Sequence, residues 1–261
     1  MAIERIVPHT IEWEAYYANH IFRYAFAKKV LPSARPLHIL DAACGVGYGS
    51  HFLAQDEQCK IVGIDQSKEA LTIANTAFSQ SNIRYVEDDC HTLEQSKVFG
   101  PFDAILSFET VEHLERPIDF IQNCYSLLRA EGILILSTPN QLVTSPTGKR
   151  DWKFHEKEYS PSELMELVSN EKFKEIRLFG QQFTAIGENR NQRRNEYHRL
   201  YQRNSFLRAM RKIKSMFNRK RNRVHLAEQI EDFESKEYNS IKAIEELGIH
   251  GPFVLMVVCK K

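Results

Sequence analysis

Short hydrophobic runs alternate with amphipathic stretches along most of this chain. When polar residues or glycines bound such runs, the runs are typical of strands that a parallel sheet buries on both faces. We expect strands at 37–43, 60–67, 82–89, 102–109, 132–139, 172–183 and 251–261. The amphipathic stretches predict helices at 48–55, 68–80, 116–132 and 160–171. This alternation indicates an α/β fold with a doubly wound, mostly parallel, seven-stranded sheet and helices on both faces.

Capping residues mark the ends of three of these helices. Ser67 stands directly before the second helix, where its side chain can accept a backbone N–H. Ser160 followed by Pro161 is typical of a helix start, and we expect it to begin the fourth helix. Gly132 is typical of a helix end, so we expect the third helix to stop there.

The same pattern divides the chain into four parts. An N-terminal helical cap is expected at 1–36, because residues 11–31 have helical periodicity and no glycine. The core is expected at 37–183, and 251–261 adds its final strand. The segment 184–250 is too long for a plain connection, so we expect it to be an insertion that contains helices of its own.

Composition narrows the class of protein. Hydrophobic residues make up 43% and charged residues 26% of the chain, which is ordinary for a globular domain. No apolar run approaches the roughly 18 residues that a membrane span needs. Acids stand near the N-terminus, where a signal peptide would be apolar. The five cysteines are scattered, which argues against a disulfide framework or a zinc site, so we expect a cytoplasmic protein.

The segment 190–223 is strongly basic. The net charge of +1 does not reveal this, because the rest of the chain is acidic. Three interpretations compete. The segment could be a helix that covers the substrate site, an amphipathic helix that lies on an anionic membrane, or a segment that binds the phosphates of a nucleic acid or an anionic substrate. The acidic remainder of the chain would repel a large polyanion, so nucleic acid is the least favoured partner. Peripheral attachment to the inner face of a membrane stays an alternative.

The stretch ILDAACGVGYGS, at 39–50, places glycines on alternate positions directly after the first expected strand. Ligands of doubly wound sheets bind at this place, and closely spaced glycines let a ligand approach the backbone. A dinucleotide loop would need a third glycine where Ser50 stands, and Asp41 would repel its pyrophosphate. A P-loop is excluded because no Gly-Lys-Ser/Thr follows. The acid favours a ligand with positive charge and no phosphate.

This stretch resembles the first motif of the class I S-adenosylmethionine-dependent methyltransferases, (D/E)-x-G-x-G-x-G, with Ala43 in place of the first glycine. Three further features match in order. Asp65 closes the second strand, EDDCHTL after the third strand resembles G-D-A-x-x-L, and SFETVEHL after the fourth is similar to E-x-x-E-H-(L/V). The resemblance, which covers about 39–139, implies a Rossmann-like methyltransferase fold and S-adenosylmethionine as the cofactor.

The resemblance also implies roles for the matched positions. Asp65 would accept hydrogen bonds from the ribose hydroxyls, and Asp89 with Cys90 would meet the adenine, although Asp88 replaces the family's glycine. The cofactor-binding residues expected in this way are Asp41, Ala43, Gly45, Gly47, Tyr48, Asp65, Gln66, Asp89, Cys90 and Ser107. A structural role stays open for each of them, such as turn capping by Asp89.

Two histidines stand where an acceptor would bind. His113 follows the fourth strand, and His155 lies in DWKFHEKEYS after the fifth, a phrase similar to one found in methyltransferases of sugars and other small hydroxylated molecules. Methyl transfer from a sulfonium depends mainly on alignment and exclusion of water, and a hydroxyl acceptor also needs a base. We hypothesise that His113 and His155 are catalytic, against a structural role for each. Glu109 and Glu112 could orient a base or line the pocket, and spacing alone does not support a metal.

The sequence thus predicts methylation of an oxygen on a small-molecule or glycan-type acceptor. An N- or C-methyltransferase and an RNA methyltransferase stay alternatives, although no N-P-P-Y-type tetrapeptide follows the fourth strand. A non-catalytic S-adenosylmethionine-binding scaffold that acts through its basic segment is an alternative of a different class.

Overall fold

A computed structural model describes residues 7–8, 11–33, 35–147, 154–185, 187–192 and 230–261. The chain forms two compact units, Met1–Gln181 with Ser235–Lys261, and Gln182–Glu234. All the residues discussed below as a candidate site belong to the first unit. Most of the predicted basic segment, 190–223, lies outside the described residues.

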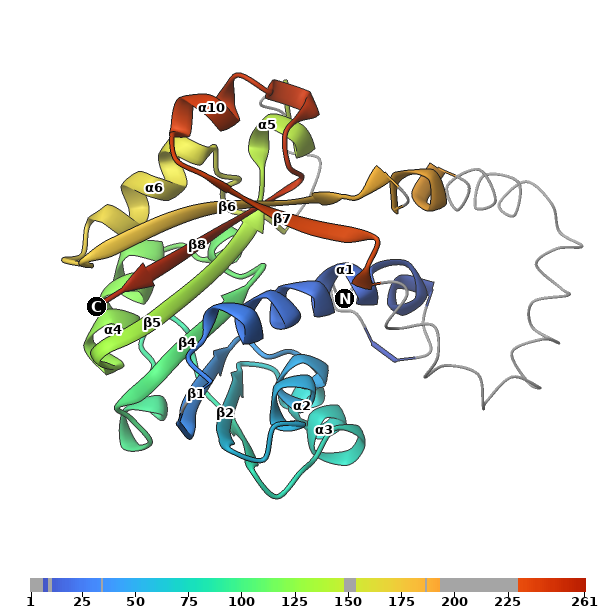
Figure 1. The fold of residues 1–261 in the computed structure, drawn as a ribbon. Coiled ribbons are helices and arrows are strands. Elements are labelled where there is room, and N and C mark those ends of the chain that lie inside the picture. Colours follow the sequence, from blue (N-terminus) through green and yellow to red (C-terminus); the bar gives the residue numbers. More distant parts are fainter. Residues whose placement is uncertain (1–6, 9–10, 34, 148–153, 186, 193–229) are drawn as a thin grey trace, which may run out of the picture. The chain divides into compact units, whose positions relative to one another are not determined.

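One sheet organises the first unit (Figure 1), and its strands lie in the order β3-β2-β1-β4-β5-β8-β6-β7. The strands are β1 Leu37–Ala42, β2 Cys59–Asp65, β3 Ile83–Glu87, β4 Phe102–Phe108, β5 Leu128–Pro139, β6 Glu175–Phe183, β7 Phe233–Tyr238 and β8 Val254–Lys260. Strands β1 to β5 pair in parallel, whereas β8 is antiparallel to both of its neighbours, β5 and β6. The predicted α/β class with a mostly parallel, doubly wound sheet is confirmed.

Helices cover both faces of this sheet (Figure 1). They are α1 Ile11–Val30, α2 Tyr48–Ala54, α3 Lys68–Ala77, α4 Pro117–Leu127, α5 Gln141–Thr144, α6 Pro161–Ser169 and α10 Ile241–Glu245. Three short 3₁₀ turns are η1 Ser96–Val98, η2 Val111–His113 and η3 Gly248–His250. Helix α1 packs against α2, and α4 packs against α6. The central strand β4 is buried along its whole length, including its two polar residues Asp103 and Ser107.

Two of the three predicted helix ends are found. The Ser67 side chain accepts the N–H of Ala70, and Ser160 with Glu163 forms a reciprocal capping box at the start of α6. The third prediction is wrong, because α4 ends at Leu127, five residues before Gly132, and β5 begins at the next residue. The ammonium of Lys261, at the end of β8, binds the carbonyl oxygens of Tyr125 and Leu128 and so satisfies the end of the helix from outside.

The segment 184–250 differs from the expectation of helices alone. It contains β7, which pairs with β6 and adds an eighth strand to the seven that the sequence predicts. The sequence of this strand, FESKEY, is mostly polar, and only its two end residues are buried. An edge strand of this kind has no apolar run, so hydrophobic periodicity could not reveal it.

The loop between β1 and α2 depends on left-handed backbone. Ala43, Gly45 and Gly47 have φ angles of 63°, 57° and 87°. Gly49 is required for a different reason, because a Cβ there would lie 1.9 Å from the ring of Tyr24 on α1. The alternate glycines therefore serve both the turn of the loop and the close packing of α1.

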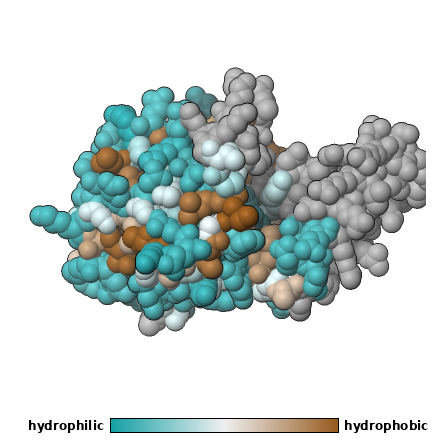
Figure 2. All heavy atoms as spheres, turned by 90° about the horizontal axis from the view of Figure 1, so that it is seen from above, coloured by the Kyte–Doolittle hydropathy of each residue, from teal (hydrophilic) through white to brown (hydrophobic). Residues whose placement is uncertain are grey.

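One face of the molecule can be seen in Figure 2, and its described residues are mostly hydrophilic. On the face shown in Figure 2, hydrophobic residues lie in separate patches among hydrophilic ones. Among the described helices, none combines the length and the apolar character that crossing a bilayer requires.

The left-handed conformation of Ala43 generates a stability prediction. An L-residue in this region costs about 1–2 kcal/mol relative to glycine, and glycine loses about 0.5–1 kcal/mol more chain entropy on folding. Ala43→Gly should therefore leave the free energy of unfolding unchanged or raise it by about 1 kcal/mol. Urea unfolding followed by circular dichroism measures it.

The matched control is Ala42→Gly, the same change one residue earlier in the buried strand β1, which should lower stability by at least about 1 kcal/mol. Equal losses for the two variants would contradict the role given to the conformation of Ala43.

Candidate active site

The parallel strands β1 to β5 end at one edge of the sheet, and the residues predicted to bind a cofactor gather there. Asp41 lies near the end of β1, Asp65 ends β2, and Asp89 follows β3. This is the edge at which open α/β sheets bind their ligands. Parallel pairing therefore brings together side chains that are far apart in the sequence.

Asp41 is completely buried below the glycine loop. Its carboxylate accepts hydrogen bonds from the Tyr24 hydroxyl at 3.1 Å and the Ser50 hydroxyl at 2.5 Å. Burial raises the pKa of Asp41 to about 6, although both hydroxyl bonds oppose this rise. Asp41 thus places a titratable negative charge under the loop, and Tyr24 joins it to helix α1.

Asp65 holds the glycine loop against the end of β2. Its carboxylate accepts the N–H of Gly45 at 3.1 Å and the N–H of Ser67 at 2.8 Å. Apart from Gly45 and its two chain neighbours, no described residue has an atom within 4 Å of a Cβ placed on Gly45. The backbone beside Asp65 is therefore open to a ligand. Gln66, the next residue, is exposed.

Asp88, Asp89 and Cys90 have separate environments after β3. Asp88 is buried and accepts hydrogen bonds from the backbone and hydroxyl of Ser96, so it anchors the following turn. Asp89 is half exposed, and its bonds to the backbone and ring of His91 hold its pKa below the ordinary value. Cys90 is buried, and burial raises the pKa of its thiol. Only Asp89 offers a charged group to solvent here.

Tyr48 is partly buried, and Ser107 is fully buried. The Tyr48 ring contacts Trp13, Tyr17 and Tyr24 of α1, with centroid separations of 5.5, 5.3 and 6.3 Å. Burial raises the pKa of the Tyr48 hydroxyl above its ordinary value. Ser107 on β4 is 1% exposed, and its hydroxyl has no hydrogen-bond partner among the described residues.

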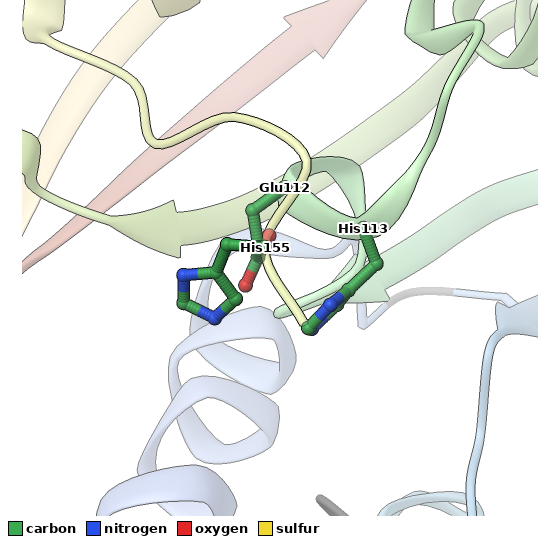
Figure 3. Close-up of side chains that lie close together, drawn as sticks. All are labelled: Glu112, His113 and His155. Atoms are coloured by element: carbon green, nitrogen blue, oxygen red, sulfur yellow. The ribbon is translucent and has the colours of Figure 1, made fainter. Parts of the chain in front are cut away.

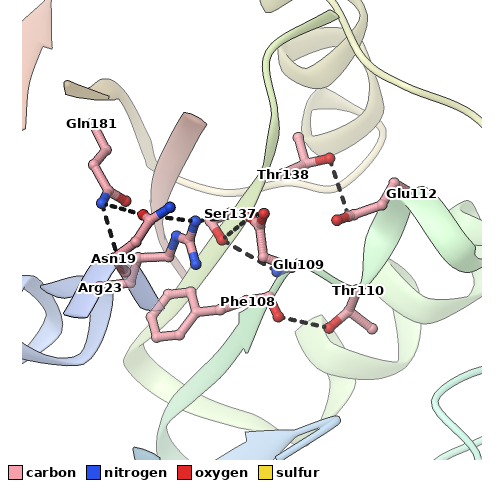
Figure 4. Close-up of polar contacts among 9 residues, drawn as sticks. All are labelled: Asn19, Arg23, Phe108, Glu109, Thr110, Glu112, Ser137, Thr138 and Gln181. Atoms are coloured by element: carbon pink, nitrogen blue, oxygen red, sulfur yellow. Dashed lines mark hydrogen bonds and ion pairs between the residues drawn. The ribbon is translucent and has the colours of Figure 1, made fainter. Parts of the chain in front are cut away.

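The structure adds a residue that the sequence reasoning missed, Arg23 of α1 (Figure 4). Its side chain is 1% exposed, and its guanidinium lies 3.4 Å from the Glu109 carboxylate and 3.3 Å from the amide oxygen of Asn19. The Nε and Nη1 atoms have no partner among the described residues. An arginine inside the apolar run HIFRYAF was a sequence signal, because a charge is rarely buried without a partner.

Glu109 links Arg23 to the strands (Figure 4). It follows β4 with a left-handed φ of 54°, and its carboxylate accepts the hydroxyl of Ser137 on β5 at 2.9 Å. Its backbone N–H also donates to the Ser137 carbonyl. Non-glycine residues in this conformation persist where the surroundings enforce them, and such positions cluster at functional sites.

Glu112 is a buried acid in the turn η2, with 1% of its surface exposed. One carboxylate oxygen accepts the hydroxyl of Thr138 at 3.1 Å, while the other, Oε1, has no partner among the described residues (Figure 4). Burial, and next the nearby charge of Glu109, raise the pKa of Glu112 well above its ordinary value.

His113 and His155 lie side by side beside Glu112 (Figure 3), with ring centroids 4.9 Å apart. The Nδ1 of His113 is 3.0 Å from the Phe154 carbonyl oxygen, and the Nδ1 of His155 is 3.0 Å from the buried carboxylate of Glu158. A carbonyl can only accept, so His113 donates from Nδ1; the carboxylate favours the same arrangement at His155.

The backbone explains how residues 42 positions apart meet. The N–H groups of Glu156 and Lys157 both donate to the carbonyl oxygen of Glu112, at 2.8 and 3.1 Å. An isolated bridge between Asn140 and Tyr159 holds the same segment beside the end of β5. These bonds dock His155 onto the turn that carries His113.

Glu112, His113 and His155 form a cluster that the spacing of the sequence did not predict. One ligand atom from each of them lies within 4.8 Å of the others. The cluster comes from η2 and from the segment after β5, at the same edge of the sheet as the glycine loop.

Comparison with known proteins agrees with this geometry. A family model described as a methyltransferase domain matches residues 34–205. A protein of Mycolicibacterium smegmatis named "Probable S-adenosylmethionine-dependent methyltransferase" is 26% identical over 65% of this chain and 63% of its own length. The match thus spans less than two thirds of that relative. A ubiquinone biosynthesis O-methyltransferase of Vibrio parahaemolyticus is 24% identical over 58% of this chain and 69% of its own length.

A crystal structure of a S-adenosylmethionine-dependent methyltransferase from Thermotoga maritima has the same fold, with a TM-score of 0.59 and 16% identity. The likeness covers 96% of this chain and 95% of that one. The family match, the order of the strands and the left-handed glycine loop lead to one conclusion. The chain belongs to the class I S-adenosylmethionine-dependent methyltransferase family.

Proposed function

We propose that this protein transfers the methyl group of S-adenosylmethionine to a hydroxyl oxygen of a small-molecule or glycan-type acceptor. The observation that carries the proposal is the pair of His113 and His155, held at the edge of the sheet at which the glycine loop also lies. The name of one relative, an O-methyltransferase of ubiquinone biosynthesis, supports an oxygen acceptor.

The cofactor would lie along the carboxyl ends of β1, β2 and β3. Asp65 is proposed to hold the ribose hydroxyls, because its carboxylate stands beside the open backbone of Gly45. Asp89 is proposed to meet the adenine amino group, since it is the exposed acid after β3. The other proposed cofactor contacts are Asp41, Ala43, Gly45, Gly47, Tyr48, Gln66, Cys90 and Ser107.

Arg23 is proposed to bind the carboxylate of the cofactor's methionine part. The site has several acids, Asp41, Asp65 and Glu109 among them, which suit the ammonium and sulfonium charges but would repel a carboxylate. Arg23 is buried beside Glu109 with two nitrogens that lack a described partner. A guanidinium N–H forms a charge-assisted hydrogen bond with a carboxylate, and leaving such N–H groups unmet costs free energy.

The reaction is an in-line displacement in which the acceptor oxygen attacks the methyl carbon and a neutral thioether leaves. The protein would contribute alignment and exclusion of water, which the aromatic residues of α1 around Tyr48 favour. We propose that His113 and His155 receive or orient the proton of the acceptor hydroxyl. Their Nδ1 atoms are occupied by Phe154 and Glu158, which directs Nε2 to this task.

Label transfer tests the function directly. Purified protein with S-adenosylmethionine labelled in its methyl group should label a small, polar component of a cell extract. Asp65→Ala should weaken binding of S-adenosylhomocysteine in calorimetry by at least roughly tenfold, since a hydrogen bond to a charged group contributes about 1.5–3 kcal/mol. The same variant should no longer transfer the labelled methyl group to a component of the extract.

Glu57→Ala, at an exposed acid, is the control and should match the wild type in both assays. If the labelled methyl group were found in RNA, or on a nitrogen or carbon atom, the proposed hydroxyl acceptor would be wrong. Binding of S-adenosylhomocysteine without transfer to any component would instead indicate a non-catalytic protein.

Arg23 can be tested with two ligands that differ in the methionine carboxylate. Arg23→Gln should weaken binding of S-adenosylhomocysteine at least roughly tenfold, because a charge-assisted hydrogen bond is lost. It should leave 5′-methylthioadenosine, which has no carboxylate, nearly unchanged. Calorimetry measures both, with the exposed Lys29→Gln on the same helix as the control. Equal weakening of the two ligands would show that Arg23 only supports the fold.

The raised pKa of Asp41 predicts a pH dependence. Because the carboxyl has a pKa of about 6 in the folded protein, it is negative above that pH and neutral below it. S-adenosylhomocysteine carries an ammonium group, so its affinity should fall as the pH drops from 7 to 5 and Asp41 loses its negative charge. Asp41→Asn should bind more weakly at pH 7 and show a flatter profile.

Stability should respond in the opposite direction. The folded chain holds this proton more tightly than the unfolded chain, whose carboxyl has a pKa near 3.8, so the contribution of Asp41 is most favourable below pH 3.8 and is lost as the pH rises to about 6. If the wild type and Asp41→Asn showed the same pH dependence of affinity and of stability, the assignment of this pKa to Asp41 would be wrong.

A further inference from the structure

We propose that Glu112, His113 and His155 bind a divalent first-row transition-metal ion on the acceptor side of the site. The role of this ion in methyl transfer rests on the proposed function, whereas its binding can be tested without it. No feature of the chain's sequence spacing points to this site, since His155 joins the other two residues only in the folded structure.

The donor atoms are already close to one another. One oxygen of Glu112 and one nitrogen of each histidine lie within 4.8 Å of one another. Ligand atoms about 2.1 Å from a shared ion are about 3–3.5 Å apart in a tetrahedral arrangement, so a small contraction would complete the site. Figure 3 shows the three side chains close together.

Glu112 provides an independent indication of a ligand. Its side chain is 99% buried, and its Oε1 has no hydrogen-bond partner among the described residues. A buried carboxylate oxygen that binds nothing costs free energy, since it has lost its water. Thr138 binds the other oxygen, which orients the carboxylate.

Both imidazoles have the support that metal-bound histidines usually have. His113 donates its Nδ1 proton to the Phe154 carbonyl, and His155 donates its Nδ1 proton to the Glu158 carboxylate. Such contacts hold the ring and place the lone pair on Nε2, which is the atom that would bind the ion. Glu158 is itself held by the Thr144 hydroxyl at 2.9 Å, so the support extends one contact further.

The donor set indicates the kind of ion. Two imidazole nitrogens and one carboxylate oxygen suit Mn²⁺, Fe²⁺, Co²⁺ or Zn²⁺, whereas Mg²⁺ and Ca²⁺ prefer oxygen ligands throughout. Three protein ligands leave coordination positions open. Glu109, whose carboxylate adds negative charge near Glu112, would further favour a cation there.

An acceptor hydroxyl could occupy an open position on this ion. Binding to the ion lowers the pKa of the hydroxyl, so that its proton passes to solvent water. The oxygen then forms its bond to the methyl carbon as the bond from that carbon to sulfur breaks. The products are the methylated oxygen and neutral S-adenosylhomocysteine. His113 and His155 would in this case hold the ion and would not themselves receive the proton.

The binding test uses chelator-treated protein, with CoCl₂ followed by absorbance and MnCl₂ by calorimetry. The wild type should bind one Co²⁺ with visible bands of a site that contains nitrogen ligands, and should bind Mn²⁺ saturably. Glu112→Gln and His155→Gln should each weaken metal binding by at least roughly tenfold. Even substitutions of residues that only support metal ligands often have an effect of this size. Glu158→Gln, which changes only the support of His155, should weaken metal binding less.

His250→Ala, at an exposed histidine of η3, is the control and should bind as the wild type does. Thermal melting of the metal-free variants identifies any that fail to fold. In that case the metal affinity of Glu158→Gln is compared with that of the wild type. No saturable binding by the wild type, or equal binding by wild type and all folded variants of the cluster, would overturn the inference.

S-adenosylhomocysteine calorimetry on the same samples, with EDTA present, separates this inference from the proposed function. Cofactor binding without metal binding would overturn the metal site and leave methyl transfer intact. Metal binding without cofactor binding would support the site and contradict the proposed function.

Discussion

The hydrogen bond from the Gly45 N–H to the Asp65 carboxylate joins the loop after β1 to the end of β2, and the geometry of the site depends on it. The loop can reach this position only because Ala43, Gly45 and Gly47 adopt left-handed backbone. Asp41, below the loop, then binds Ser50 at the start of α2 and Tyr24 on α1. One short turn thus sets the positions of two helices and two acids.

Charge is concentrated where the strands end. Arg23, Asp41 and Glu112 are each less than 2% exposed, and Glu109 lies between Arg23 and the end of β5. Burying such groups is costly unless they are paired. Several of their atoms lack partners among the described residues. The proposed ligands, a carboxylate at Arg23 and a cation at Glu112, would supply partners for these atoms.

Much of the fold was predictable because parallel strands and their helices follow hydrophobic periodicity. The strands β1 to β6 and β8 were expected near their observed positions, as were the caps at Ser67 and Ser160. The end of α4 was not, since Lys261, which satisfies it, is more than 130 residues away. Strand β7 was missed because its polar sequence pairs only at an edge of the sheet.

By itself, the sequence determined the class of fold and the motif residues of the cofactor edge, because each of these depends on neighbours within a short stretch of chain. Only the tertiary structure decided which distant side chains meet. Arg23 reaches Glu109 through the packing of α1, and His155 reaches His113 because the N–H groups of Glu156 and Lys157 bind the Glu112 carbonyl. Contacts of this kind follow from backbone bonds between remote segments, and hydrophobic periodicity does not record them.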